Sequence, residues 1–133
     1  MMRTYHGSCH CGAVRFEADL DLSQGSLRCN CSFCLKIRCW AVMAKPEAFR
    51  LLAGEAEMNV YQFGAKNEHH HFCKHCGVRP YGIGNSPRYG VFYGVNVASL
   101  DGVSDEDLAG TPITYVDGRA DNWISPPTET RYL

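Results

Sequence analysis

Seven of the eight cysteines lie in three short groups along the 133-residue chain, and their spacing suits metal binding. The groups are Cys9-His10-Cys11, Cys29-Asn30-Cys31-Ser32-Phe33-Cys34 and Cys73-Lys74-His75-Cys76. Thiolates one or two residues apart can reach the same tetrahedral zinc ion, with bonds of about 2.3 Å. Gly12 and Gly77 directly follow the first and third groups, and glycine tolerates the positive φ of a tight turn.

The first and third groups each supply one cysteine pair, and two pairs complete one closed site. We therefore expect a structural Zn²⁺ held by Cys9, Cys11, Cys73 and Cys76, which would stabilise the native state alone. Disulfides in a secreted chain are the alternative. Cysteines separated by one residue are awkward to bridge, and no apolar signal segment precedes Cys9, so free thiols are favoured.

The middle group predicts a catalytic zinc. Cys29, Cys31 and Cys34 provide three thiolates and leave a fourth position for water or a substrate sulfur. In the alternative reading Cys39 fills that position and both metals are structural. Because Cys39 comes where a strand is expected to begin, we interpret it as a small buried hydrophobic residue. A third reading makes Cys39 a reactive thiol used for sensing or detoxification.

Three thiolates on Zn²⁺ favour thiol chemistry over activation of water, because the resulting site is a soft and weak Lewis acid. Lys36 and Arg38 lie close by in the sequence and could bind a substrate carboxylate or lower thiol pKa values. A solvated surface pair is an equally good interpretation of these two residues. Lys36, Arg38 and Tyr81 are the candidates for a general acid.

Three consecutive histidines, His69, His70 and His71, precede the third cysteine group, and imidazole is a good zinc ligand. In an extended segment alternate side chains point to opposite faces, so at most His69 and His71 can converge. The alternative is a polar strand face leading into the zinc loop. His10 and His75 are expected to face solvent or to support neighbouring ligands.

The composition excludes some partners. With 13 Lys and Arg against 14 Asp and Glu, and no basic cluster, the chain is not expected to bind nucleic acid. No apolar run approaches the ~20 residues that span a bilayer, so no membrane partner is expected. Without a secretory signal, we expect a reducing cytoplasm. The sequence leaves the oligomeric state open.

No repeat or linker divides the chain, so we expect one domain over 1–133 with a core at about 3–123. Strand-like runs occur at 13–18, 40–44, 58–63 and 89–97, and the second and fourth are apolar enough for central strands. Helical signals are weak, with a short helix expected at 104–108 and one turn at 46–49. These patterns predict a mainly antiparallel β domain, with 125–128 as an extended tail over the body.

The cysteine groups lie within longer motifs, GSCHCGAV at 7–14, CNCSFC at 29–34 followed by Lys36, and FCKHCG at 72–77. In this order and spacing they resemble the glutathione-dependent formaldehyde-activating enzyme family, which also includes centromere protein V. The resemblance spans 7–77. The strand-rich remainder to about Trp123, with its Asp117-Gly118 turn, is compatible with it.

This resemblance implies a mainly β fold of the zinc-containing β-tent-like class, similar to methionine sulfoxide reductase B. It implies the same two zinc sites, and the addition of glutathione to formaldehyde to give S-(hydroxymethyl)glutathione, classed as a carbon-sulfur lyase in reverse. The chain departs from the family at Arg38-Cys39-Trp40 and at 80–84. Two alternatives therefore stay open: a different thiol or carbonyl substrate, and a zinc-stabilised binding module that uses exposed aromatics such as Phe92 and Tyr93. In an apolar strand, however, these two are expected to be core residues.

Overall fold

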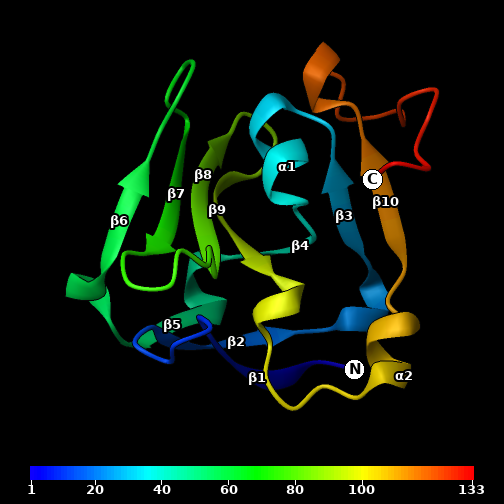
Figure 1. The fold of residues 1–133 in the computed structure, drawn as a ribbon. Coiled ribbons are helices and arrows are strands. Elements are labelled where there is room, and N and C mark those ends of the chain that lie inside the picture. The colour runs from blue at the N-terminus through cyan, green and yellow to red at the C-terminus, as the bar shows by residue number, and fades with distance from the viewer.

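Ten strands in two sheets form the framework of the computed structural model, which describes residues 1–133 (Figure 1). The small antiparallel sheet has the order β1 (Arg3–Ser8), β2 (Arg15–Leu20) and β5 (Phe49–Ala53). The large sheet has the order β10 (Ile113–Val116), β3 (Ser26–Cys29), β4 (Ala41–Ala44), β9 (Gly90–Asn96), β8 (Tyr81–Ser86), β7 (Glu68–Cys73) and β6 (Met58–Tyr61). The fold is therefore mainly β, as predicted.

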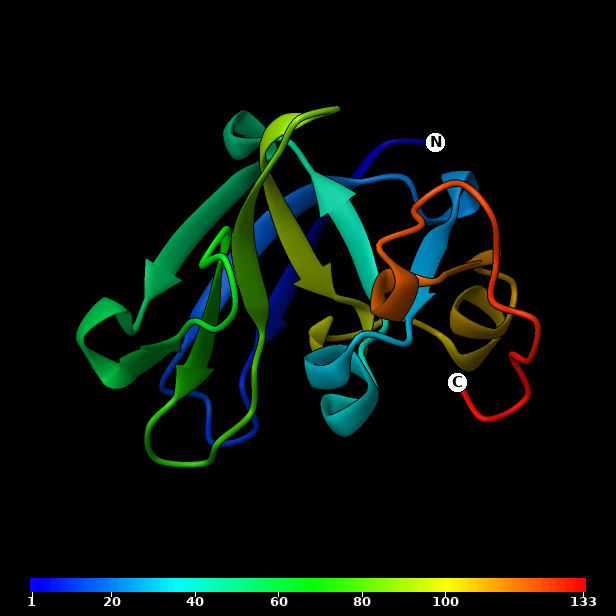
Figure 2. The ribbon, with the colours of Figure 1, turned by 90° about the horizontal axis from the view of Figure 1, so that it is seen from above.

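Two short helices complete the framework, α1 (Ser32–Ile37) and α2 (Asp105–Ala109). Seen from above, the β6–β7 end and the β3–β10 end of the large sheet lie on either side of α1 (Figure 2). This arrangement brings residues from both ends of the sheet next to one helix. Neither helix has the length and apolar character needed to cross a membrane.

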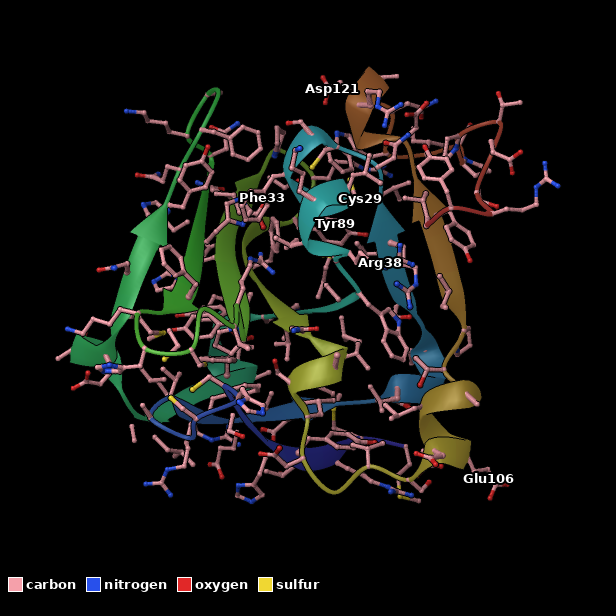
Figure 3. The ribbon with its side chains drawn as sticks, in the orientation of Figure 1. Cys29, Phe33, Arg38, Tyr89, Glu106 and Asp121 are labelled. Atoms are coloured by element: carbon pink, nitrogen blue, oxygen red, sulfur yellow. The ribbon has the colours of Figure 1, made fainter.

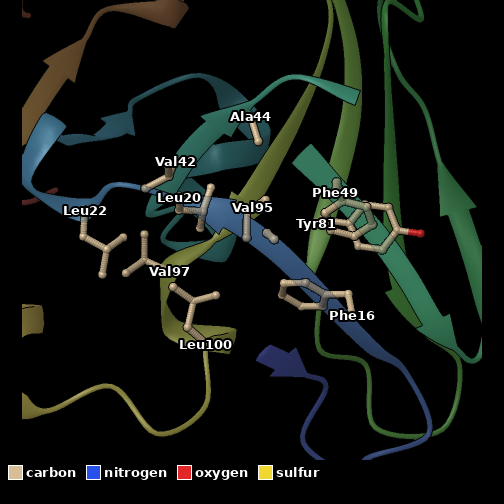
Figure 4. Packing of buried hydrophobic residues seen from close by; sticks show 11 residues of the cluster. Phe16, Leu20, Leu22, Val42, Ala44, Phe49, Tyr81, Val95, Val97 and Leu100 are labelled. Carbon is tan, nitrogen blue, oxygen red and sulfur yellow. The ribbon is translucent and has the colours of Figure 1, made fainter. Parts of the chain in front are cut away.

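The core lies between the two sheets (Figure 4). In β2, Phe16, Ala18 and Leu20 alternate with more exposed residues and point inward, as expected for a sheet with one buried face. The Phe16 ring stacks on Phe49 of β5 at 5.2 Å between centroids, and Phe49 contacts Tyr81 of β8 at 4.5 Å. Burial of these aromatic rings fixes the small sheet against the large one.

The predicted runs at 13–18, 40–44, 58–63 and 89–97 overlap β2, β4, β6 and β9. β4 and β9 pair with each other in the middle of the large sheet, which confirms their central position. The expected short helix overlaps α2, and residues Pro46–Ala48 form a single 3₁₀ turn. One pairing departs from the antiparallel pattern, because β10 runs parallel to β3.

Helix α1 was not predicted, and the unusual residue at its N-cap, Cys31, explains why. The Cys31 sulfur accepts a hydrogen bond from the Cys34 N–H and caps the helix, a task that Ser, Thr, Asp or Asn usually performs. Arg38 ends the helix in a left-handed conformation with φ of 52°. The expectation that Cys39 enters a strand was therefore wrong, since Cys39 lies between the end of α1 and the start of β4.

Candidate active site

The end of β1 and the end of β7 bring four cysteines together, which we call the Cys9 cluster: Cys9, Cys11, Cys73 and Cys76. Their sulfur atoms all lie within 4.8 Å of one another. Cys11 Sγ is 3.7 Å from Cys9 Sγ and 3.6 Å from Cys73 Sγ. Bonds of about 2.3 Å place sulfur atoms about 3.8 Å apart around a tetrahedral zinc, whereas a disulfide bond is about 2.0 Å long. The four free thiols thus fit a metal ion.

Backbone N–H groups stabilise negative charge on sulfur atoms of the Cys9 cluster. The Val14 N–H donates to Cys9 Sγ at 3.3 Å, and a hydrogen bond from the Val78 backbone contributes most to lowering the pKa of Cys76 to about 6. Both turns after the cysteine pairs contain glycine at positive φ, 81° at Gly12 and 78° at Gly77, as expected. With Cys9 and Cys73 buried, this site is closed on its inner side.

A second set of sulfur atoms, which we call the Cys29 cluster, consists of Cys29, Cys31 and Cys34. Cys29 ends β3, Cys31 caps α1 and Cys34 lies in the first turn of that helix. All three sulfur atoms lie within 4.8 Å of one another. The Cys31 N–H donates to Cys29 Sγ at 3.3 Å, and the Cys34 N–H donates to Cys31 Sγ at 3.3 Å.

The charge balance of the Cys29 cluster favours a cation. Hydrogen bonds from the Cys29 and Cys34 thiols lower the pKa of Cys31 to about 2, while the contact with Cys31 raises the pKa of Cys29 to about 11. Three thiolates at this spacing repel one another, so a bound cation is needed for all three to ionise. A soft divalent metal suits this sulfur set.

No fourth Cys, His, Asp or Glu completes the Cys29 cluster. Cys39 is half-buried, and its N–H donates to the Cys34 carbonyl at 2.9 Å. Contact with the Cys34 thiol also lowers the pKa of Cys39. Nevertheless Cys39 is outside the group of converging sulfur atoms, and none of the three consecutive histidines joins either cluster. The protein thus supplies three ligands to the Cys29 cluster.

A loop from the far end of the chain covers the Cys29 cluster. The Asn30 side chain, which is buried, donates to Asp117 Oδ1 at 2.8 Å and accepts from the Arg119 N–H at 3.0 Å. A Cβ added at Gly118 would be 2.5 Å from Cys29 Sγ, so the backbone there passes directly against the sulfur. In Figure 3 this turn, marked by Asp121, stands over Cys29. The absence of a side chain at Gly118 makes room for the cluster.

A narrow hollow adjoins the Cys29 cluster, and its lining residues are Arg28, Cys29, Cys34, Leu35, Arg38, Cys39, Tyr132 and Leu133. Arg38 thus lies beside the cluster, as the sequence suggested. Lys36 is exposed on α1 and is not part of this lining. Tyr81 is buried in the main core, and burial contributes most to raising its pKa to about 12. Of the three general-acid candidates, only Arg38 lines the hollow.

Aromatic rings from β6, β7 and the segment between them pack against α1. The ring of Phe33 lies 3.9 Å from His70, 5.5 Å from Tyr61 and 5.7 Å from Phe63, measured between centroids. Figure 3 shows Phe33 on the side of α1 that faces β7 and β8, with Cys29 on the other side. Phe33 therefore separates the aromatic group from the sulfur atoms.

A series of polar contacts links Glu68 and Arg79 to His70 of the aromatic group. Arg79 Nε donates to His70 Nδ1 at 3.1 Å, and Arg79 also forms a salt bridge with Glu68 at 3.5 Å. No motif in the sequence marks His70, Arg79 or Glu68 as site residues. Strand alternation placed His70 opposite His69 and His71, and this was the one signal that could have singled it out.

Two comparisons with known proteins agree with this geometry. A family model described as glutathione-dependent formaldehyde-activating enzyme matches residues 4–116, which include both cysteine clusters. A protein from Rhodobacter sphaeroides, solved by crystallography as a structural genomics target, is 37% identical to this chain with a TM-score of 0.70. The match covers 82% of this chain and 99% of the other.

Proposed function

The chain belongs to the glutathione-dependent formaldehyde-activating enzyme family, and we propose that it joins a thiol to a small carbonyl compound at the Cys29 cluster. The observation that carries this proposal is the convergence of three sulfur atoms with no fourth protein ligand. The family description points to glutathione as the thiol and to formaldehyde as the carbonyl compound. Read in reverse, the reaction is a carbon-sulfur lyase reaction.

The metal we propose at the Cys29 cluster is Zn²⁺, held by Cys29, Cys31 and Cys34. When bound, it supplies an open position for a substrate sulfur and favours the thiolate at neutral pH. The protein's own residues orient this site. Backbone N–H groups of α1 stabilise the sulfur charge, and the loop around Gly118 limits access of water on one side.

The residues that line the hollow select the substrate. Arg38 lies beside Cys34 and Cys39, where its guanidinium is placed to attract a carboxylate of the thiol substrate. Lys36 is exposed on α1, two residues before Arg38, and adds positive charge near this end of the helix. The thiol loses one proton and gains one bond to carbon, and the carbonyl oxygen ends as a hydroxyl.

We assign a structural Zn²⁺ to the Cys9 cluster, because its four sulfur atoms leave no position for a substrate. Residues 1–133 then act as one zinc-stabilised domain, with a core at about 3–123 and the remaining residues as a tail. We propose a reducing cytoplasm as its location, which the eight free thiols support.

The test is to count zinc with and without added glutathione, and then to measure the loss of free formaldehyde. We expect two ions per chain, of which a thiol or a chelator exchanges one, and formaldehyde loss faster than the uncatalysed rate. Cys31→Ser is the matched control and should lose the exchangeable ion and the activity. Two equally inert ions with no formaldehyde uptake would instead indicate a binding module.

A further inference from the structure

Residues 126–133, which we call the Tyr132 segment, form one wall of the hollow beside the Cys29 cluster. Tyr132 and Leu133 of this segment line the hollow together with Cys29 and Cys34 of the cluster itself. Leu133 is half-buried, and Tyr132 is 39% exposed. Figure 1 shows the segment turning back so that its end lies beside β10, the strand that pairs with β3. The segment therefore borders the space next to the sulfur atoms.

With the Tyr132 segment in place, the hollow is too small for a substrate. Its volume is about 10 Å³, close to the smallest space that holds one water molecule. A tripeptide thiol such as glutathione cannot enter this space. A thiol that approaches the sulfur atoms through the hollow must therefore displace Tyr132 and Leu133.

Packing, and no hydrogen bond, attaches the Tyr132 segment to the rest of the protein. Inside the segment, the Leu133 N–H donates to the Thr130 carbonyl at 3.0 Å, and the Arg131 side chain pairs with that of Glu129. Just before the segment the chain is fixed at Asn122, whose Oδ1 accepts from two following N–H groups at 3.1 Å. Because no hydrogen bond has to break, displacement of the segment mainly exposes the side chains that it buries.

The other walls of the hollow contain two arginines that no acidic group of the protein neutralises. Arg28 of β3 and Arg38 at the end of α1 both line the hollow, and neither forms a salt bridge. Arg28 is held in place, because its Cζ lies 5.1 Å from the centroid of the Trp40 ring. A guanidinium forms strong paired hydrogen bonds with a carboxylate. Glutathione, the thiol in the family description, has two carboxylates and can gain contacts that the Leu133 side chain does not make.

We propose that Tyr132 and Leu133 determine which thiols reach the Cys29 cluster, because they close the hollow until a thiol that carries a carboxylate displaces them. The inference rests on the proposed function and adds a selection step to it. Glutathione pairs with Arg28 and Arg38 as it enters, and this pairing compensates for the lost packing of the segment. A small thiol without a carboxylate, such as 2-mercaptoethanol, cannot form these pairs and displaces the segment poorly.

The rate at which zinc leaves the Cys29 cluster tests the closure without any turnover. In Leu133→Ser, transfer of the exchangeable zinc to a coloured chelator should be about tenfold faster than in the wild type, because the loss of apolar burial favours the open form. Ile124→Ser is the matched control and should behave like the wild type, since Ile124 is 82% exposed and does not line the hollow. If the isolated protein holds no metal in this cluster, the rate of Cys34 alkylation by iodoacetamide provides the same comparison.

A spectroscopic measurement tests the displacement of the segment by the thiol. In the ¹³C-methyl spectrum of leucine-labelled protein, added glutathione should move the Leu133 signals to the position of a mobile, solvent-exposed leucine. The same concentration of 2-mercaptoethanol should move them much less. In Arg28→Gln, the shift should need about tenfold more glutathione, because one charged hydrogen-bond partner is lost. The signals of Leu52, which is 51% exposed in β5, should stay constant throughout.

The outcomes separate this inference from the proposed function. Equal zinc-transfer or alkylation rates in Leu133→Ser and Ile124→Ser would overturn the closure of the hollow. Leu133 signals that ignore glutathione, or that respond equally to 2-mercaptoethanol, would overturn the selection of the thiol. Both measurements are made without formaldehyde. A protein that opens as expected and yet consumes no formaldehyde would therefore refute the proposed reaction alone.

Discussion

Asn30 Nδ2 donates a hydrogen bond of 2.8 Å to Asp117 Oδ1, although 87 residues separate the two in the chain. Each of the two residues directly follows a strand, Asn30 after β3 and Asp117 after β10. These strands are parallel, and their last residues, Cys29 and Val116, are in register. The Asn30 oxygen also accepts from the Arg119 N–H at 3.0 Å. One amide side chain therefore joins the cysteine-bearing segment to the loop that covers it.

Asn30→Ala should destabilise the protein by about 1–3 kcal/mol, because it removes both hydrogen bonds of a buried side chain, to Asp117 and from the Arg119 N–H. It should also weaken metal binding at the Cys29 cluster and leave the Cys9 cluster unchanged. Urea denaturation and metal counting measure the two effects. Asn59→Ala, at an exposed position of β6, is the control. Equal behaviour of the two variants would contradict a role for Asn30 in holding the loop.

Gly118→Ala should displace the covering loop, since the added Cβ would lie 2.5 Å from Cys29 Sγ and 2.9 Å from the Trp123 ring. We expect loss of the exchangeable metal ion and of activity, with little loss of secondary structure by circular dichroism. Gly94→Ala is a matched control, because a Cβ there meets nothing closer than 3.9 Å. A Gly118→Ala protein that keeps both metals and its activity would show that the loop is not in close contact with the cluster.

Substitutions in the two clusters should have different consequences. Cys31→Ser should abolish turnover and leave the fold intact, whereas Cys76→Ser should unfold the protein, because metal binding at a closed four-cysteine site contributes directly to folding. Activity assays and thermal denaturation of both variants compare the two sites. Similar structural damage in both would refute the division between a catalytic and a structural metal.

His70 should make stability depend on pH. The pKa of His70 is about 4 in the folded protein, against 6.5 for an unperturbed histidine. Below about pH 6.5 the unfolded chain binds a proton that the native state does not bind, so the free energy of unfolding decreases until about pH 4 and then levels off. The charged or titratable groups that act on the ring are Arg79, Cys31, His69 and His71.

Urea denaturation at about pH 7 and about pH 5 measures this effect in the wild type and in His70→Phe. Allowing for solvent screening, the wild type should lose about 1 kcal/mol more than the variant over this interval. The same pH dependence in both proteins would mean that His70 is protonated as easily in the folded state as in the unfolded chain.

The cysteine clusters could be predicted from the sequence because close spacing makes metal ligation a local property. The spacing predicts that the first and third cysteine groups share one site and that the middle group forms another. The sulfur atoms converge in these same two sets. The sequence also gave the right prediction for the turns at Gly12 and Gly77, because positive φ selects glycine.

The surroundings of the clusters depend on pairings between distant segments, and residue spacing carries no signal for these. The contact of Asn30 with Asp117 needs the parallel register of β3 and β10. The contact of His70 with Phe33 needs α1, which was missed because a cysteine sulfur caps it. Strand alternation favours His69 and His71 as a converging pair, whereas the histidine that contacts α1 is His70, on the opposite face of β7.

The parallel pairing of β10 with β3 also affects the order in which the protein assembles during translation. The sulfur atoms, turns and backbone donors described for the Cys9 cluster all lie at or before Val78, so this cluster can close while the last third of the chain is still being synthesised. The Cys29 cluster has all its sulfur atoms early, yet its cover arrives only after Gly118 and Arg119 have left the ribosome. On a nascent chain, the thiols of Cys29, Cys31 and Cys34 are therefore exposed to solvent for a time. Metal ions can reach them during that time, before β10 pairs with β3.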